Sequence, residues 1–193
     1  EVPITKIVAR YPDAGAVNHK GTTGADNEVF FVSARGGLRS LSTVFENTGG
    51  QNIEVKDYFD VIRPTIANYD FSSAASIYFD KKILVACKSD SDQSSNDRVV
   101  VFDLRTQGIV VYVGWNVADW FVYQKELYFG SGAEPNCYKA FDGFSDYYQT
   151  SETPIDVIWR SKRFNFGRPS MEKEIDYIYV EGLIAAGTEI EET

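Results

Sequence analysis

The stretch ADWFVYQKELYFGSGAEPNCYKAFDG, residues 118–143, has the pattern of three short strands joined by tight turns. The first strand ends at Gln124 and Lys125, and the second begins near Leu127. A loop over residues 131–135 leads to a third strand at residues 137–141, where side chains of different polarity alternate. Apolar segments of this length, separated by polar turns, are typical of antiparallel β-sheet.

The same pattern occurs twice earlier in the chain. Apolar runs that follow a two-residue polar turn begin near Val29 and Ile83, as one does near Leu127, so the spacings are 54 and 44 residues. The turns are Asp26 with Asn27, Asp80 with Lys81, and Gln124 with Lys125. Antiparallel strands that repeat about every 40–50 residues are typical of propeller blades. The sequence therefore predicts an all-β fold with β-propeller-like blades.

Residues 57–67 are the one segment with a helical period, because Tyr58, Ile62 and Ile66 recur at every fourth position. Pro64 lies inside this segment, where a proline is expected to break or kink a helix. One short helix is therefore predicted near residues 57–67. Four residues at the centres of predicted strands are expected to be buried: Phe31, Val85, Val101 and Phe129.

The composition favours strands and argues against several functions. Aromatic residues make up 15% of the 193 residues, and large flat side chains pack well on a pleated sheet. The formal net charge of −9 argues against an autonomous nucleic-acid binder, which would present a basic surface. No apolar run approaches the roughly 20 residues that a membrane-spanning helix needs, so no span is expected.

The character of the sequence changes near its end, which predicts two regions. Residues 1–150 form the propeller-like β domain, and residues 142–153 are read as a polar, tyrosine-containing linker. Residues 151–193 are expected to begin a second β region, with a strand pair at residues 155–159 and 175–180. The chain does not begin with methionine, and its last strand-like segment has no following partner. We therefore expect a part of a longer protein or a processed product.

No cluster of residues has the spacing of a catalytic site or a metal site. His19 is the only histidine and lies in a loop, without a partner that would orient it as a general base. The loop at residues 89–97 contains four oxygen-bearing side chains: Asp90, Asp92, Asn96 and Asp97. A calcium loop needs Gly at its sixth position and Glu at its twelfth, where this chain has Ser95 and Val101. A solvated loop is therefore favoured over a cation site.

The two cysteines, Cys87 and Cys137, are too few for a four-thiolate metal site. Both lie in or beside apolar strand-like runs, so buried free thiols are expected rather than a disulfide. No nucleophile motif, phosphate loop or zinc motif occurs. The sequence therefore predicts a protein that is not an enzyme and requires no cofactor.

Four blocks, taken in order, resemble the propeller-type virion structural proteins of tailed phages, such as tail nozzle, hub and stopper proteins. The blocks are DNEVFFVS at 26–33 with GGLRSL at 36–41; RVVVFD at 98–103 with Gly114 and Trp115; ELYFGS at 126–131 with Tyr138 and FDG at 141–143; and WRSKRFNFGRP at 159–169. The expected short helix follows the first block, as it does in that family. One departure is the tryptophan usual before the second hairpin's turn, which this chain lacks.

The resemblance implies an architectural role in the virion, in the tail or the neck region. It implies a subunit that assembles with copies of itself and with other virion proteins into a ring or tube, through which DNA passes without sequence-specific binding. An alternative is a propeller that recognises a glycan, such as a host receptor, through exposed aromatic side chains: Tyr147, Tyr148, Trp115 or Trp120. Core packing is the simpler role for Trp115, Trp120 and Trp159.

A hydrolase is a third class of function. A glycosidase would need two carboxyl groups about 5–9.5 Å apart, which the sequence does not identify among its 28 acidic residues.

Basic and acidic residues are segregated in the last part of the chain. Residues 160–173 carry five basic side chains and one acidic, whereas residues 174–193 carry six acidic and none basic. Within one subunit the two segments could neutralise each other. In a ring, the basic loop of one subunit would face an acidic surface of the next. The candidate interface residues are Arg160, Lys162, Arg163, Phe164, Phe166 and Arg168.

Reversing the charge of Arg160, Arg163 and Arg168 to Glu is expected to weaken self-assembly, because charge across an interface sets register and association rate. Light scattering against salt concentration measures the effect, and the difference from the parent should shrink at high salt through screening. Unchanged assembly by a folded triple variant would remove this loop from the interface.

Overall fold

The computed structural model describes residues 15–26, 28–33, 36–45, 51–143, 145–148 and 151–154. The chain divides into two compact units, Glu1–Phe141 and Asp142–Thr193. The described residues are mostly β-strand, with one short α-helix and one 3-10 turn. The prediction of a mostly β protein is therefore confirmed. The first unit ends at Phe141, and the division into domains at residues 150 and 151 stays a prediction.

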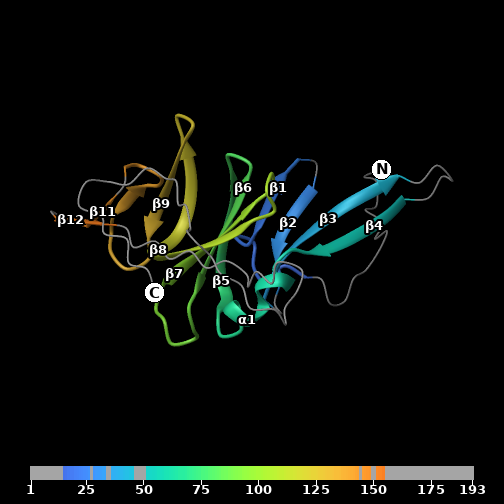
Figure 1. Cartoon of the computed structure of the whole chain (residues 1–193), viewed down its shortest axis with the longest axis horizontal. Coiled ribbons are helices and arrows are strands. Elements are labelled where there is room, and N and C mark those ends of the chain that lie inside the picture. The colour runs from blue at the N-terminus through green and yellow to red at the C-terminus, as the bar shows by residue number, and fades with distance from the viewer. Residues whose placement is uncertain are drawn as a thin grey trace, which may run out of the picture. The chain divides into compact units, whose positions relative to one another are not determined.

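The first sheet is an antiparallel meander in the order β1-β2-β3-β4 (Figure 1). Its strands are β1 (Thr22–Ala25), β2 (Glu28–Val32), β3 (Leu38–Phe45) and β4 (Gln51–Asp57). Ala25 pairs with Glu28, and Asp26 between them has a positive φ of 47°, as a tight turn requires; Asn27 lies outside the described residues. Phe30 and Val32 belong to the core, whereas Val29 is half exposed.

The second sheet has six antiparallel strands in the order β10-β9-β8-β7-β6-β5. They are β5 (Asp70–Phe79), β6 (Lys82–Lys88), β7 (Asn96–Asp103), β8 (Ile109–Tyr123), β9 (Glu126–Ser131) and β10 (Cys137–Lys139). The two predicted two-residue turns are present: Asp80 and Lys81 have φ of 44° and 60°, and Gln124 and Lys125 have φ of 50° and 67°. Positive φ at both positions matches the type I′ turn, whose twist fits the flanking strands.

The three sequence repeats do not form three separate sheets. In a propeller each repeat would be a blade of four strands. Ile83 and Leu127, equivalent positions of the second and third repeats, lie on β6 and β9 of the same six-stranded sheet. The described residues therefore show a mostly β fold built of meanders, and they do not show a ring of blades.

The longest strand, β8, corrects one prediction. The strand predicted to end at Gln124 does not begin near residue 118, because a single strand of 15 residues already starts at Ile109. Between the pairs Arg98–Val113 and Asn96–Val117, β8 advances four residues while β7 advances two. Gly114, at φ of 90°, lies in this bulge. A bulge bends a strand without ending it, so the apparent interruption in the sequence is a bend.

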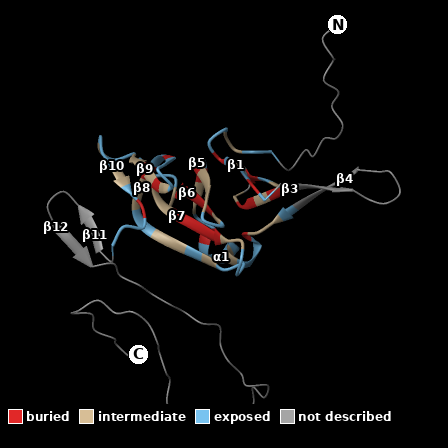
Figure 2. Ribbon diagram, turned by 90° about the horizontal axis from the view of Figure 1, so that it is seen from above, coloured by how far each residue is buried: buried red, intermediate tan, exposed pale blue. Residues whose placement is uncertain are grey.

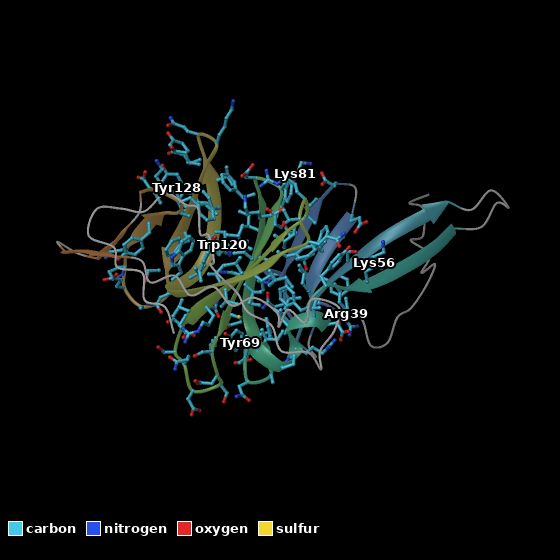
Figure 3. All side chains as sticks on the ribbon, in the orientation of Figure 1. Arg39, Lys56, Tyr69, Lys81, Trp120 and Tyr128 are labelled. Carbon is cyan, nitrogen blue, oxygen red and sulfur yellow. The ribbon has the colours of Figure 1, made fainter. Side chains whose placement is uncertain are left out.

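The side chain of Asn96 joins this bend to a second irregular segment, in β5. Asn96 is buried, and its Nδ2 donates to the carbonyls of Ser73 at 3.0 Å and Val117 at 2.9 Å. Its Oδ1 accepts a bond from Ser73 Oγ at 2.8 Å. Nearby, Trp120 Nε1 donates to the carbonyl of Ala75 at 3.0 Å (Figure 3). The sheet therefore curls until β8 touches β5, although β6 and β7 separate them in the strand order.

This curl buries the central strands on both faces. All five residues from 83 to 87 are buried on β6, and Figure 2 shows a buried run on β7 as well. One face packs on the first sheet and the helical segment, through Val85, Val100, Phe102, Phe30, Leu38 and Phe59. The other face lies inside the curl, with Leu84, Val99, Val101, Trp120 and Phe129. The four predicted core residues, Phe31, Val85, Val101 and Phe129, are all buried.

The predicted helix is confirmed in its position along the chain, but its first part is a 3-10 turn and its α-helical part is short. A 3-10 turn, η1 (Asp60–Ile62), leads directly into α1 (Arg63–Ile66). Ile66 is buried, and Tyr58 and Ile62 pack against the first core cluster, as the period predicted. Pro64 does not break the helix, because it lies at its first positions, where no helical N–H is required.

The second unit contains a described hairpin of β11 (Ser145–Tyr148) and β12 (Ser151–Pro154). Part of the predicted linker at residues 142–153 is therefore paired strand, and that prediction is wrong for these residues. The predicted strands at 155–159 and 175–180 lie outside the described residues. None of the described helices is long and apolar enough to cross a bilayer.

Replacing Phe129 by Ala is expected to lower the free energy of unfolding by about 3–5 kcal/mol, through lost transfer energy and a residual cavity. The Phe129 ring contacts Trp115, Trp120 and Tyr138 with centroids 5.2, 5.8 and 5.5 Å away. Urea unfolding measures the change, and Phe121→Ala on the exposed side of β8 is the matched control, expected to change far less. Equal losses in the two variants would mean that the assigned faces of the hairpin are wrong.

Candidate functional site

In the acidic loop at residues 89–97, the carboxylates of Asp90 and Asp97 accept hydrogen bonds from backbone N–H groups of the same loop. Asp97 Oδ1 accepts from the backbone N–H of Ser89 at 2.7 Å, and Oδ2 pairs with Arg98 at 2.7 Å. Asp90 Oδ1 accepts from the N–H of Asp92 at 2.8 Å, which holds the pKa of Asp90 below its usual range. The side chain of Asn96 already bonds to Ser73 and to the carbonyl of Val117 within the sheet. Within the described ranges, no three His, Cys, Asp or Glu side chains are arranged to hold a metal ion.

The two cysteines differ in environment. Cys87 is fully buried on β6, and burial raises the pKa of its thiol, so it is a poor nucleophile. Cys137 is exposed at the start of the edge strand β10, and both thiols are free. The prediction of two buried thiols is therefore wrong for Cys137. Side chains alternate along β10, so the packing of Tyr138 against Phe129 turns Cys137 outward.

Two of the four aromatic side chains predicted to contact a glycan are packed inside the protein. Trp120 is buried and donates to a backbone carbonyl. Trp115 is partly buried, and its ring stacks on Phe129 at 5.2 Å and 11°. The simpler packing role is therefore confirmed for both. Tyr147 lies on β11 with Tyr148, but their side chains are outside the described set.

The remaining predicted site residues lie outside the part of the chain that the structure describes. They are Trp159 and the six candidate interface residues Arg160, Lys162, Arg163, Phe164, Phe166 and Arg168. His19 is described: it is exposed in the turn before β1, and no hydrogen bond from its ring is among the described contacts.

A cleft of about 490 Å³ lies where α1 meets the start of β5. Its lining is Val17, Gly36, Arg63, Ile66, Ala67, Tyr69, Asp70, Phe71 and Ser72. Ile66 and Phe71 are buried, so they form an apolar floor. A Cβ on Gly36 would lie 3.2 Å from the ring of Phe71, and Gly36 has φ of 70°. Glycine is therefore required where this turn approaches the cleft.

Charged side chains beside the cleft are held in fixed positions. Asp57 accepts from the N–H of Phe59 at 3.1 Å and forms an ion pair with Arg63. Arg63 Nε also donates to Asp60 at 2.7 Å, and this bond, with the charge of Asp57, raises the pKa of Arg63. Asp70 accepts from the N–H and hydroxyl of Ser72, which lowers its pKa. The cleft thus combines an apolar floor with a charged rim.

The end of the β8–β9 hairpin exposes three consecutive apolar side chains. Phe121, Val122 and Tyr123 have exposed fractions of 43%, 49% and 58%. The ring of Phe121 stacks on that of Tyr128 at 5.3 Å. Solvent-facing strands normally avoid such runs, and exposed apolar patches commonly mark interaction sites. Sequence reasoning missed this surface, because the residues read as an ordinary buried strand.

Comparison of the chain with known protein families, characterised proteins and solved structures finds no match. The cleft and the exposed hairpin end are therefore interpreted from their own chemistry. Among the described residues that line the cleft there is no histidine, cysteine or lysine, and Asp70 is the one carboxylate. An apolar floor with a charged rim suits the binding of a side chain or a small ligand better than bond cleavage.

Replacing Asn96 by Ala is expected to lower the free energy of unfolding by about 2–4 kcal/mol, because the buried carbonyl of Val117 and the partly buried carbonyl of Ser73 lose their donor.

Millimolar calcium is expected to leave the melting temperature of the parent unchanged, since two of the three loop carboxylates, those of Asp90 and Asp97, already have partners. The matched control is Asp92→Ala, an exposed loop residue, which should melt like the parent. A calcium-dependent rise in melting temperature that Asp92→Ala abolished would instead establish a cation site.

Proposed function

We propose that this chain is a structural component of a virus particle, most simply a phage tail or neck subunit. It assembles with copies of itself and with other virion proteins into a ring or tube through which DNA passes. It performs no catalysis and needs no cofactor. Its location is the virion.

The observation that carries the proposal is the order of the resembling blocks on the fold. Apart from Asn27, three of the four blocks fall in described residues, and each of them contains strands. The first block is β2 and the start of β3; β4 comes next, and then η1 and α1, the short helix that the family resemblance implies. The second is β7 with the bend of β8 at Gly114, and the third is β9 with β10.

The finer fold proposed is a β-propeller-type architecture. The meander β1-β2-β3-β4 has the strand number and the sequential order of one blade, which supports this reading. The six-stranded sheet has two strands more than a blade, so it would correspond to a blade with an added hairpin.

Charge and surface character also support an architectural role. A net charge of −9 suits a wall past which DNA moves, because like charge prevents adhesion to phosphates. The exposed apolar side chains at the hairpin end suit a protein whose surface becomes partly buried when it assembles with other subunits. The glycan-binding alternative has weaker support, since Trp120 is buried and the partly buried ring of Trp115 stacks on Phe129.

The purified chain is expected to self-associate into a closed ring of uniform size, because a heterologous contact closes when the rotation between subunits fits. Sedimentation velocity over a wide concentration range measures the association, and negative-stain images show the shape. A protein that stays monomeric at the highest soluble concentration would contradict self-assembly. Retention of the monomer by immobilised neutral polysaccharide would favour the glycan-binding alternative.

A further inference from the structure

We propose that residues 109–113, the first part of β8, form a sheet edge that pairs with the same segment of a second copy. The two segments run antiparallel about a two-fold axis at Val111, so the six-stranded sheets of two copies join into one. Backbone hydrogen bonds supply the recognition, as in other cases of strand addition. This contact differs from the ring contact of the proposed function and does not depend on it.

Only one side of this segment is paired with another described strand. On that side, residues 109–113 pair with residues 98–102 of β7. On the other side of β8, the pairing with β9 begins at Val117. A backbone bond from the N–H of Gly132 to the carbonyl of Asn116, at 2.6 Å, extends it by one residue. The bulge then separates the two parts of β8, so β9 does not reach the segment.

A backbone bond at the β7–β8 turn establishes which groups of the segment point outward. The N–H of Asp103 donates to the carbonyl of Gly108 at 3.0 Å. Backbone groups alternate in direction along an antiparallel ladder. The N–H and C=O groups of Ile109, Val111 and Val113 therefore point away from β7, and no backbone bond joins them to another described residue. They form a row of donors and acceptors along the edge.

The segment lacks the side chains that normally keep an edge strand from pairing with another chain. Charged residues and prolines serve this purpose in natural sheets. Residues 109–113 are Ile, Val, Val, Tyr and Val, with Gly108 before them and Gly114 after them. Val110 and Val113 have exposed fractions of 54% and 60%. The segment is therefore an apolar edge of five residues that is accessible to another strand.

A second copy of the segment fits this edge because the segment is complementary to itself. In an antiparallel pair centred on Val111, the outward N–H groups of each copy meet the outward carbonyls of the other. Ile109 of one copy then lies opposite Val113 of the other, so apolar side chains meet across the join. No side chain of residues 109–113 is charged, so no like charges face each other.

The other edges of the two sheets in the first unit are less suitable. The edge strands β1 and β5 lie against each other, and the N–H of Ser76 donates to the carbonyl of Lys20 at 2.8 Å. The edge strand β10 has three residues, one of which is Lys139, paired with Glu126. The edge strand β4 has charged residues at three of its seven positions. Residues 109–113 combine an uncharged sequence with an uncovered side.

The expected dimer is weak. One added strand pair with few side chains buries less than the roughly 1,600 Å² of a standard stable interface. The dimer should therefore dissociate on dilution. A two-fold contact closes on itself, so it gives a dimer of single chains, or it joins two rings where the ring of the proposed function forms.

A disulfide across the two-fold axis tests the pairing and its register. In a Cys137→Ser background, which removes the exposed thiol, Val111→Cys should form a disulfide-linked dimer on a non-reducing gel. The two Cα atoms of a hydrogen-bonded antiparallel pair are about 5.5 Å apart, which a disulfide can span. The matched control is Val113→Cys, which is more exposed but would lie about 14 Å from its counterpart. Cross-linking of Val113→Cys at an equal or higher rate would overturn the inference.

A proline tests whether the backbone carries the contact. Val113→Pro removes an outward N–H and no bond to β7, so the sheet should tolerate it. This variant should need at least about tenfold more protein to dimerise in sedimentation velocity, because the two-fold axis doubles the loss. Val113→Thr keeps the N–H and should dimerise like the parent. Urea unfolding establishes that both variants are folded.

Unchanged dimerisation by folded Val113→Pro, or a parent that gives no dimer at any concentration, would overturn the inference. A ring that forms without this dimer would also overturn it and would leave the proposed function intact. A dimer that Val113→Pro abolishes and that never grows into a ring would support the inference and contradict the proposed ring.

Discussion

The side-chain amide of Asn96 connects two strands that are not neighbours in the six-stranded sheet. By bonding to Ser73 on β5 and to the carbonyl of Val117 on β8, it satisfies backbone groups that the irregular pairing of these strands leaves open. Buried polar groups are costly unless they are paired, so these bonds make the curl of the sheet possible. The curl in turn encloses the second core cluster and gives β6 and β7 two buried faces. Side chains that lie outside the curl, such as Phe121 at the hairpin end, remain exposed to solvent or to a partner.

Local sequence patterns predicted the parts of the fold that depend on neighbours in the chain. The turns at Asp80 and Gln124 followed from polar pairs between apolar runs, and the helical segment followed from the period of Tyr58, Ile62 and Ile66. The single long strand β8 was not predictable in this way, because a bulge at Gly114 and a loop at Gly114 have the same local sequence. What distinguishes them is the pairing of β8 with two different strands, β7 and β9.

The candidate surfaces likewise could not be predicted from local sequence patterns. Residues 121–123 have the composition of a core strand, and only the position where the hairpin leaves the sheet makes them exposed. The cleft joins Val17, Gly36 and Asp70, which no sequence motif connects. Charge segregation after Trp159 was visible in the sequence alone, since it needs only a count of side chains. The sequence argued against a cation site in the acidic loop at residues 89–97, but only the structure shows that the carboxylates of Asp90 and Asp97 bond to backbone N–H groups.

The meander order of both sheets also sets the order in which the chain can fold. Within each of the two sheets of the first unit, every described strand pairs with its neighbour in sequence, so each hairpin closes a short loop at little entropic cost. The bonds that close the curl span 23 residues for Ser73 with Asn96 and 45 residues for Ala75 with Trp120. Chain order places β5, β6 and β7 ahead of Trp120, so these three strands leave the ribosome and can pair before Trp120 does. Until β8 arrives, the face of Leu84 and Val101 is uncovered, and the nascent chain is most prone to aggregation during this interval.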